Sequence, residues 1–116
     1  MKYKNYDEFC KAIKGCGFKT KEAEYANSPK PPMVVHLRDT DNYISADSEQ
    51  SYLSTVVIVE LYTEKDNFAD ERKLEKWFRY NGIYFLKSER EYISTERWYV
   101  TRYEIEIELD EPEDET

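Results

Sequence analysis

The side chains best suited to covalent or metal chemistry in this sequence lie in one short region. His36 is the only histidine, and Asp39, Asp41 and Asp47 follow it closely. A histidine beside a nucleophile can act as a general base, and clustered carboxylates can bind a hard divalent cation. No serine or cysteine stands in a recognisable catalytic motif with His36, so we interpret it as a partly buried strand residue. The sequence therefore predicts no catalytic residue and no enzyme.

The same acidic segment does not fit a calcium-binding loop. Ile44 stands where the sharp turn of such a loop needs glycine, and Gln50 stands where a bidentate glutamate is expected. Asp and Asn also favour turns, which explains the cluster equally well. The two cysteines, Cys10 and Cys16, have neither redox nor zinc spacing, and the glycines cannot form a phosphate-binding loop. We expect no metal and no cofactor.

The charge of the chain argues against nucleic acid and membranes as partners. The formal net charge is −8, whereas phosphate binding depends on clustered Lys and Arg. No apolar stretch approaches the roughly 20 residues of a membrane span, and no secretory signal is evident, so a cytoplasmic location is expected. Residues 1 to 38 are net basic and residues 39 to 116 net acidic. Chains with two parts of opposite charge can associate head to tail. A solvated surface on which positive and negative charges are segregated explains the same charge pattern.

Two strands dominate the pattern of the chain. From residue 99 to residue 109, Tyr, Thr, Ile and Leu alternate with charged residues. Because side chains alternate sides in an extended chain, this pattern predicts a strand with one buried and one solvent-facing side. Residues 52 to 62 are rich in β-branched and aromatic side chains, which is typical of a central strand that is apolar on both faces.

Two amphipathic helices are predicted to pack against these strands. Asn5 can cap the first helix, and two glycines follow its end. Asn67 can cap the second helix, on which Glu75 and Arg79 have the spacing of an ion pair on the solvent side. The residues predicted to form the buried stripes are Tyr6, Phe9, Cys10 and Ile13 in the first helix and Leu74, Trp77 and Phe78 in the second.

Shorter strands complete the predicted architecture. Residues 33 to 37 and 43 to 46 form two of them, separated by a turn, and residues 83 to 92 form another. The order is α-β-β-β-α-β-β, which predicts an α+β fold: a mainly antiparallel sheet of about five strands with two helices packed on one face. Residues 1 to 109 form a single domain, and residues 110 to 116 form an acidic, disordered tail.

Trp98 and Val100 indicate a contact surface. They point to the same side of their strand as Glu104, Glu106 and Glu108, so two apolar side chains stand on an otherwise charged face. Either a helix or loop of the same chain covers them, or a second subunit does.

Several segments of the chain carry a resemblance to one family. They are residues 33 to 47, MVVHLRDTDNYISAD, residues 59 to 66, VELYTEKD, the strand that starts at Gly82, and the hairpin and strand from residue 92 to residue 106. Taken in this order, over about residues 32 to 108, the chain resembles the small tail-completion, or head-tail joining, proteins of long-tailed phages and prophages of Gram-positive bacteria. Ser45 departs from the pattern, because an aromatic residue is expected there.

The resemblance implies a structural function. Proteins of this kind are α+β subunits that close the growing tail tube as a ring, expected to be hexameric, and present a surface to the head connector. The implied partners are further copies of the chain, the tail tube and the connector. The implied location is the bacterial host cytoplasm during assembly and then the head-tail junction of the virion.

Within such a ring, three parts of the chain are expected to make contacts. They are the strand start at Trp98, Tyr99 and Val100, the polar loop with Asp39, Asp41, Tyr43 and Asp47, and the basic N-terminal helix with Lys11 and Lys14.

Two other interpretations stay open. The first is an acidic phage-encoded module that inhibits a basic host protein through Glu104, Glu106, Glu108 and the tail. It would bind a cationic protein without self-association. The second is a metal-dependent hydrolase built on His36 and the aspartates. A bound metal would stabilise such a protein, and changing Asp39 and Asp41 to Asn would abolish that stabilisation.

Overall fold

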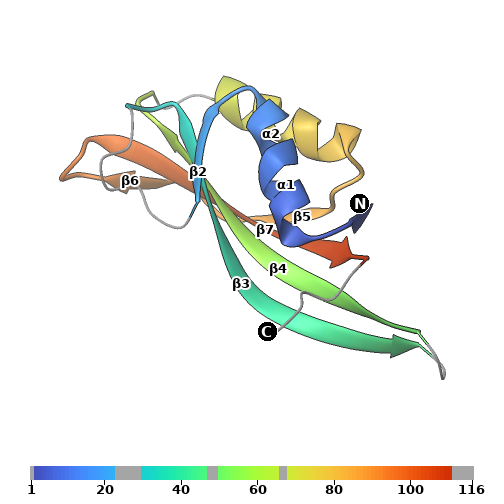
Figure 1. The fold of residues 1–116 in the computed structure, drawn as a ribbon. Helices are drawn as coiled ribbons and strands as arrows, with labels where there is room; N and C mark the ends of the chain where they lie inside the picture. Colours follow the sequence, from blue (N-terminus) through green and yellow to red (C-terminus); the bar gives the residue numbers. More distant parts are fainter. Residues whose placement is uncertain (1, 23–29, 47–49, 66–67, 111–116) are drawn as a thin grey trace.

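The computed structural model describes residues 2–22, 30–46, 50–65 and 68–110, which form one sheet and two α-helices in an α+β fold (Figure 1). The elements in chain order are β1 Lys2–Tyr3, α1 Tyr6–Ile13, a 3₁₀ helix Lys14–Cys16, β2 Lys19–Glu22, β3 Met33–Ala46, β4 Gln50–Thr63, α2 Ala69–Tyr80, β5 Phe85–Lys87, β6 Glu91–Ile93 and β7 Trp98–Leu109.

The sheet is built around β4, as predicted for the central strand. Its order is β1-β7-β4-β3-β2, and β5 and β6 also pair with β7. β4 is antiparallel to both β3 and β7, whereas β1 runs parallel to β7 and β2 runs parallel to β3. The prediction of a mainly antiparallel sheet is broadly confirmed. The sheet described here has seven strands rather than about five, and the predicted order of elements is wrong because β1 and β2 flank α1.

The N-terminal strand closes one edge of the sheet. Tyr3 in β1 pairs with Leu109 at the end of β7, and the backbone N–H of Asp110 donates to the carbonyl of Tyr3 at 2.7 Å. β1 has only two residues, so it carries no periodicity of its own. Sequence patterns cannot show such a strand, because it exists only through pairing with its neighbour.

β3 is one continuous strand, so the turn predicted between residues 37 and 43 is wrong. The register against β4 shifts between Arg38 and Thr40, which leaves Asp39 as the extra residue of a β-bulge. The Arg38 guanidinium donates to both carboxylate oxygens of Asp41 at 3.0 Å. The Thr55 hydroxyl of β4 also donates to Asp41, which links this polar segment to the neighbouring strand.

The strand predicted over residues 83 to 92 is also wrong, because it is divided into β5 and β6. Between them, the backbone N–H of Ser88 donates to the carbonyl of Arg102 at 2.9 Å, and the Ser88 hydroxyl accepts from the Arg102 N–H at 3.1 Å. The chain leaves the ladder after Ser88 and returns at Glu91.

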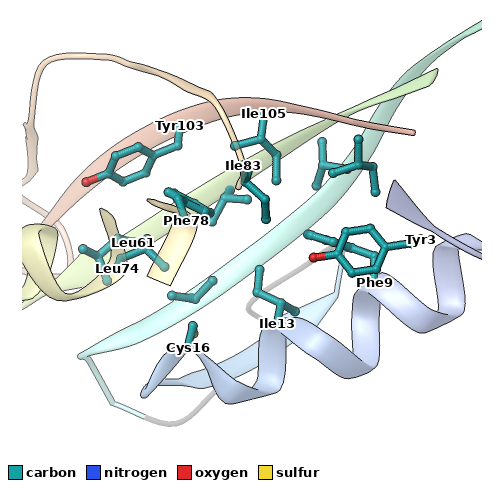
Figure 2. Close-up of a cluster of buried hydrophobic side chains, with 14 of the residues drawn as sticks. Tyr3, Phe9, Ile13, Cys16, Leu61, Leu74, Phe78, Ile83, Tyr103 and Ile105 are labelled. Carbon is teal, nitrogen blue, oxygen red and sulfur yellow. The ribbon is translucent and has the colours of Figure 1, made fainter. Parts of the chain in front are cut away.

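The main core lies between the helices and one face of the sheet (Figure 2). Phe9 and Ile13 of α1 and Leu74 and Phe78 of α2 are fully buried, so the prediction of two helices on one face is confirmed. Asn5 caps α1 as predicted, because its Oδ1 accepts from the Glu8 N–H at 2.9 Å. The predicted alternation in β7 is confirmed: its core side consists of the buried residues Thr101, Tyr103, Ile105, Ile107 and Leu109.

The start of α2 differs from the expectation. Asn67 lies outside the described residues, and Phe68 stands at the cap position without a capping side-chain hydrogen bond. Of the predicted acidic tail, residues 110 to 116, Asp110 is described and donates to Tyr3, whereas residues 111 to 116 lie outside the described residues, so their disorder stays a prediction.

We expect Phe78→Ala to lower the free energy of unfolding by about 3–5 kcal/mol, because the change opens a cavity in the core. The Phe78 ring packs against Tyr103 and Phe85, with centroids at 5.4 and 5.3 Å. Urea unfolding measures the loss. Tyr80 is 88% exposed on the same helix, so Tyr80→Ala is the control and should change stability by no more than about 0.5 kcal/mol. Equal effects of the two substitutions would contradict the packing described.

Candidate assembly surfaces

The aromatic patch, which we define as Phe68, Arg90, Tyr92 and Tyr99, is an exposed surface with the composition of a protein interface. Phe68 is 59% exposed and Tyr92 54% exposed. The rings of Tyr92 and Tyr99 lie 4.9 Å apart, and the Arg90 guanidinium lies 4.5 Å from the centre of the Phe68 ring. The patch surrounds a hollow of about 440 Å³. It combines residues from the start of α2, the β5–β6 connection, β6 and β7.

Trp98 and Val100 lie on the other side of β7 from Tyr99. Val100 is only 1% exposed and belongs to a second, smaller core. That core contains Met33, Val35, Tyr62 and Val100, with Ile93 and Trp98 packed against it. The sequence left open whether the same chain or a second subunit covers these residues, and the structure shows that the chain itself covers Val100. Trp98 stays half-buried, with its ring edge-on to Tyr62 at 6.1 Å.

Two buried glutamates lie beneath the aromatic patch. Glu71 and Glu75 of α2 are 3% and 8% exposed, so the prediction that Glu75 lies on the solvent side is wrong. Lys87 bridges them: its Nζ lies 2.6 Å from Glu71 Oε1 and 2.8 Å from Glu75 Oε2. Arg79 does approach Glu75, but only at 3.7 Å and from an exposed position.

Further donors complete this network. Arg90 Nε lies 2.7 Å from Glu71 Oε2, which also accepts from the Thr101 hydroxyl at 3.0 Å. The Tyr103 hydroxyl donates to Glu75 at 2.8 Å. Burial alone would lower the pKa of Lys87, but hydrogen bonds and charge from Glu71 and Glu75 outweigh burial and raise it.

The network links several elements of the chain. Both oxygens of Glu71 and one of Glu75 are already hydrogen-bonded within the chain. The network ties α2 to the β5–β6 connection and holds Arg90 against Phe68. The sequence did contain a signal for it, because Glu71 and Glu75 share helical spacing with Leu74 and Phe78 and so fall on the buried stripe.

His36 is a buried strand residue that packs against α1. His36 is 3% exposed, and its ring stands edge-on to Phe9 of α1 at 6.1 Å. Burial lowers its pKa, as does the charge of Lys14, whereas Glu22 acts in the opposite direction. The residues placed by the structure contain no group of three or more His, Cys, Asp and Glu able to hold a metal ion.

The aspartates predicted as contact residues are partly used within the chain. Burial alone would raise the pKa of Asp41, but hydrogen bonds from Thr55 and Arg38 outweigh burial and lower it. Asp39 is exposed and accepts from the Thr40 hydroxyl at 2.9 Å. Asp47 lies outside the described residues, and only the backbone of Tyr43, within β3, is described.

Lys11 and Lys14 are exposed near the end of α1, as a contact role requires. Lys11 forms an ion pair with Asp7 at 3.1 Å on the same helix. The structure therefore leaves the sequence-predicted contact residues in separate places rather than on one surface.

Comparison of the chain with known protein families and with curated proteins gives no match. Among the residues described, no helix is long and apolar enough to cross a membrane.

We expect Glu71→Gln to lower the free energy of unfolding by about 2–4 kcal/mol, because removing one charge leaves Lys87 and Arg90 incompletely paired near the core. The expected loss lies below that of a fully buried pair, since the Lys87 side chain is 35% exposed. Urea unfolding measures it. Glu64 is exposed, so Glu64→Gln is the matched control. An unchanged midpoint for Glu71→Gln would show that the network contributes nothing.

Stability should depend on pH through His36. Because the folded pKa of His36 is lowered from 6.5, the unfolded chain binds this proton more readily in acid. Its contribution is therefore complete above about pH 6.5 and is lost as the pH falls. Compared with the native chain, His36→Leu should lose less stability between about pH 7 and pH 5. Thermal unfolding at several pH values tests this, and parallel curves for the two proteins would refute it.

Proposed function

We propose that this protein is a non-catalytic phage or prophage subunit that completes the tail tube and joins it to the head by assembling into a ring. The aromatic patch is the observation that best supports this proposal. Tyr, Phe and Arg are enriched at interfaces, and a few such residues provide most of the binding energy. Exposed aromatic side chains that form one contiguous patch mark a contact site more strongly than rings exposed singly.

The patch is suited to binding because it is preformed. Its residues come from several elements, and the Glu71 network ties these elements together below the surface. A surface that is already ordered loses little conformational entropy when a partner binds. The same rigidity supports a structural function, in which subunits must repeat one geometry.

A ring also requires two different surfaces on each subunit. In a heterologous contact, one surface of a subunit binds a different surface of the next, and the chain of contacts closes when the rotation allows it. With its helices on one side of the sheet only, this fold provides two unlike sides. In this proposal the partners are other copies, the tail tube and the head connector. Assembly takes place in the bacterial host cytoplasm, and the ring ends at the head-tail junction of the virion.

A second candidate function is the acidic module that binds a basic host protein. It is favoured by one observation, the exposed carboxylates of Glu104, Glu106 and Glu108 on one face of β7. A module of this kind would bind a cationic protein as a monomer, whereas the ring subunit would self-associate.

We expect Tyr92→Glu to prevent ring formation, because it places a charge in the middle of the aromatic patch. Sedimentation velocity over a range of concentrations, with electron microscopy of native rings, measures assembly. Tyr80→Glu adds the same charge at an exposed tyrosine outside the patch and should assemble normally. Trp98→Glu should also yield folded monomers, but it is a less specific test since Trp98 contacts Tyr62.

Two results would contradict the proposal. One is native protein that stays monomeric at every concentration and salt level, alone or with tail tubes. The other is normal ring formation by Tyr92→Glu, which would remove the patch from the assembly contact.

A further inference from the structure

The open face, which we define as the sheet surface opposite the helices, presents apolar side chains that the rest of the described chain leaves exposed. In the register of the sheet, Leu37 pairs with Ile58, Ile58 with Glu104, and Glu104 with Leu86. These four residues therefore form one row across β3, β4, β7 and β5. Leu37 is 46% exposed and Leu86 is 55% exposed. Figure 1 shows both helices on the other side of the sheet.

The open face is also acidic. Glu104, Glu106 and Glu108 are exposed along β7, and within the described residues none of the three forms an ion pair. By contrast, Glu60 on the same face lies 2.8 Å from Arg102. Uncompensated charge therefore lies along β7, within and beside the row of Leu37, Ile58 and Leu86, which we call the apolar row.

Two shallow hollows lie between these residues. One, of about 330 Å³, is lined by Ile58, Leu86, Arg102 and Glu104 among others. The other, of about 270 Å³, lies over Val56, Tyr84 and Leu86, with Glu104 and Glu106 also lining it. An apolar floor beside carboxylates suits long cationic side chains, which can lay their methylene groups on the floor and place their charge at the rim.

The helix side of the same molecule carries such side chains. Lys73 of α2 donates to the carbonyl of Gly17 at 3.1 Å, and its ammonium lies 4.7 Å from the centre of the Phe18 ring. Lys14 lies close to Gly17 in the chain and is exposed. We define Lys14 and Lys73 as the lysine corner, where α2 meets the 3₁₀ helix that follows α1.

We propose that the open face of one copy binds the helix side of a second copy, with its glutamates against the lysine corner. This inference rests on the proposed ring function, and it specifies which two surfaces meet in the contact between copies. Charge complementarity identifies the second copy as the partner, since one chain carries both the acidic, apolar surface and the basic surface. The two surfaces lie on opposite sides of the sheet, so the contact is heterologous.

The aromatic patch is compatible with this arrangement. Tyr99 is on the same side of β7 as Thr101 and Tyr103, which face α2. The patch therefore lies on the helix side, as the lysine corner does. The apolar row of one copy and the aromatic patch of the next can then contribute to one interface.

Charge reversal tests the pairing. The face variant carries Glu104→Lys and Glu106→Lys, and the corner variant carries Lys14→Glu and Lys73→Glu. Each variant alone should self-associate at least about tenfold more weakly than the native chain, since like charges would then meet. An equimolar mixture of the two, or one chain with all four changes, should recover assembly to within about threefold of the native chain. Sedimentation velocity at low salt measures this association, and circular dichroism checks the fold.

The matched control is Glu64→Lys with Glu96→Lys, which reverses two exposed charges outside both surfaces and should assemble normally. If the native chain forms rings and both charge variants form them equally well, the pairing is wrong while the ring function stands. If both variants stay monomeric but the mixture does not recover, the open face does not bind the lysine corner. Native chain that never self-associates would overturn both proposals. If the native chain and the corner variant then bound a cationic protein but the face variant did not, the acidic module would be favoured.

Discussion

The placement of two carboxylates in the core constrains much of this structure. Glu71 and Glu75 are buried on α2, and a buried charge is tolerated only when it is paired and hydrogen-bonded. Lys87, the last residue of β5, and Arg90, in the connection from β5 to β6, meet that requirement. The chain must therefore leave the ladder after β5 so that Arg90 can reach the helix. The aromatic patch is a consequence of that detour, because Arg90 then lies over Phe68.

The elements predicted correctly are those with long, regular patterns. β7 alternates from Thr101 to Leu109, and α1 has both an apolar stripe and a capping Asn5, so local sequence determines them. β1 and β2 could not be predicted, since two and four residues carry no period and depend on pairing with β7 and β3. In β3, the turn-forming residues around Asp39 fit a bulge as well as a turn. The contacts that accompany the continuous strand involve its neighbour: Arg38 pairs with Asp41, and both contact the Thr55 hydroxyl of β4.

The candidate surfaces were predictable to a similar extent. Alternation correctly put Trp98, Val100 and the β7 glutamates on one face, but it could not show that the chain itself buries Val100. Glu71 and Glu75 were assigned by residue type to the solvent, although their helical spacing put them with Leu74. Their partners lie on other elements, and the spacing of residues along one helix does not show which side chains of other elements lie near it. The apolar row of the open face was equally invisible, because it depends on the register of four strands.

The pairing of β1 with β7 has a consequence for biosynthesis. β7 contributes one side of the core and pairs with β1, β4, β5 and β6, so the sheet joins segments from nearly the whole described chain. Contacts this distant in sequence close late, and they slow folding because long loops must be ordered first. During synthesis, the apolar sides of α1 and of the β3–β4 hairpin would stay exposed until Leu109 had left the ribosome. The nascent chain is therefore a natural client for chaperones until its last strand is inserted.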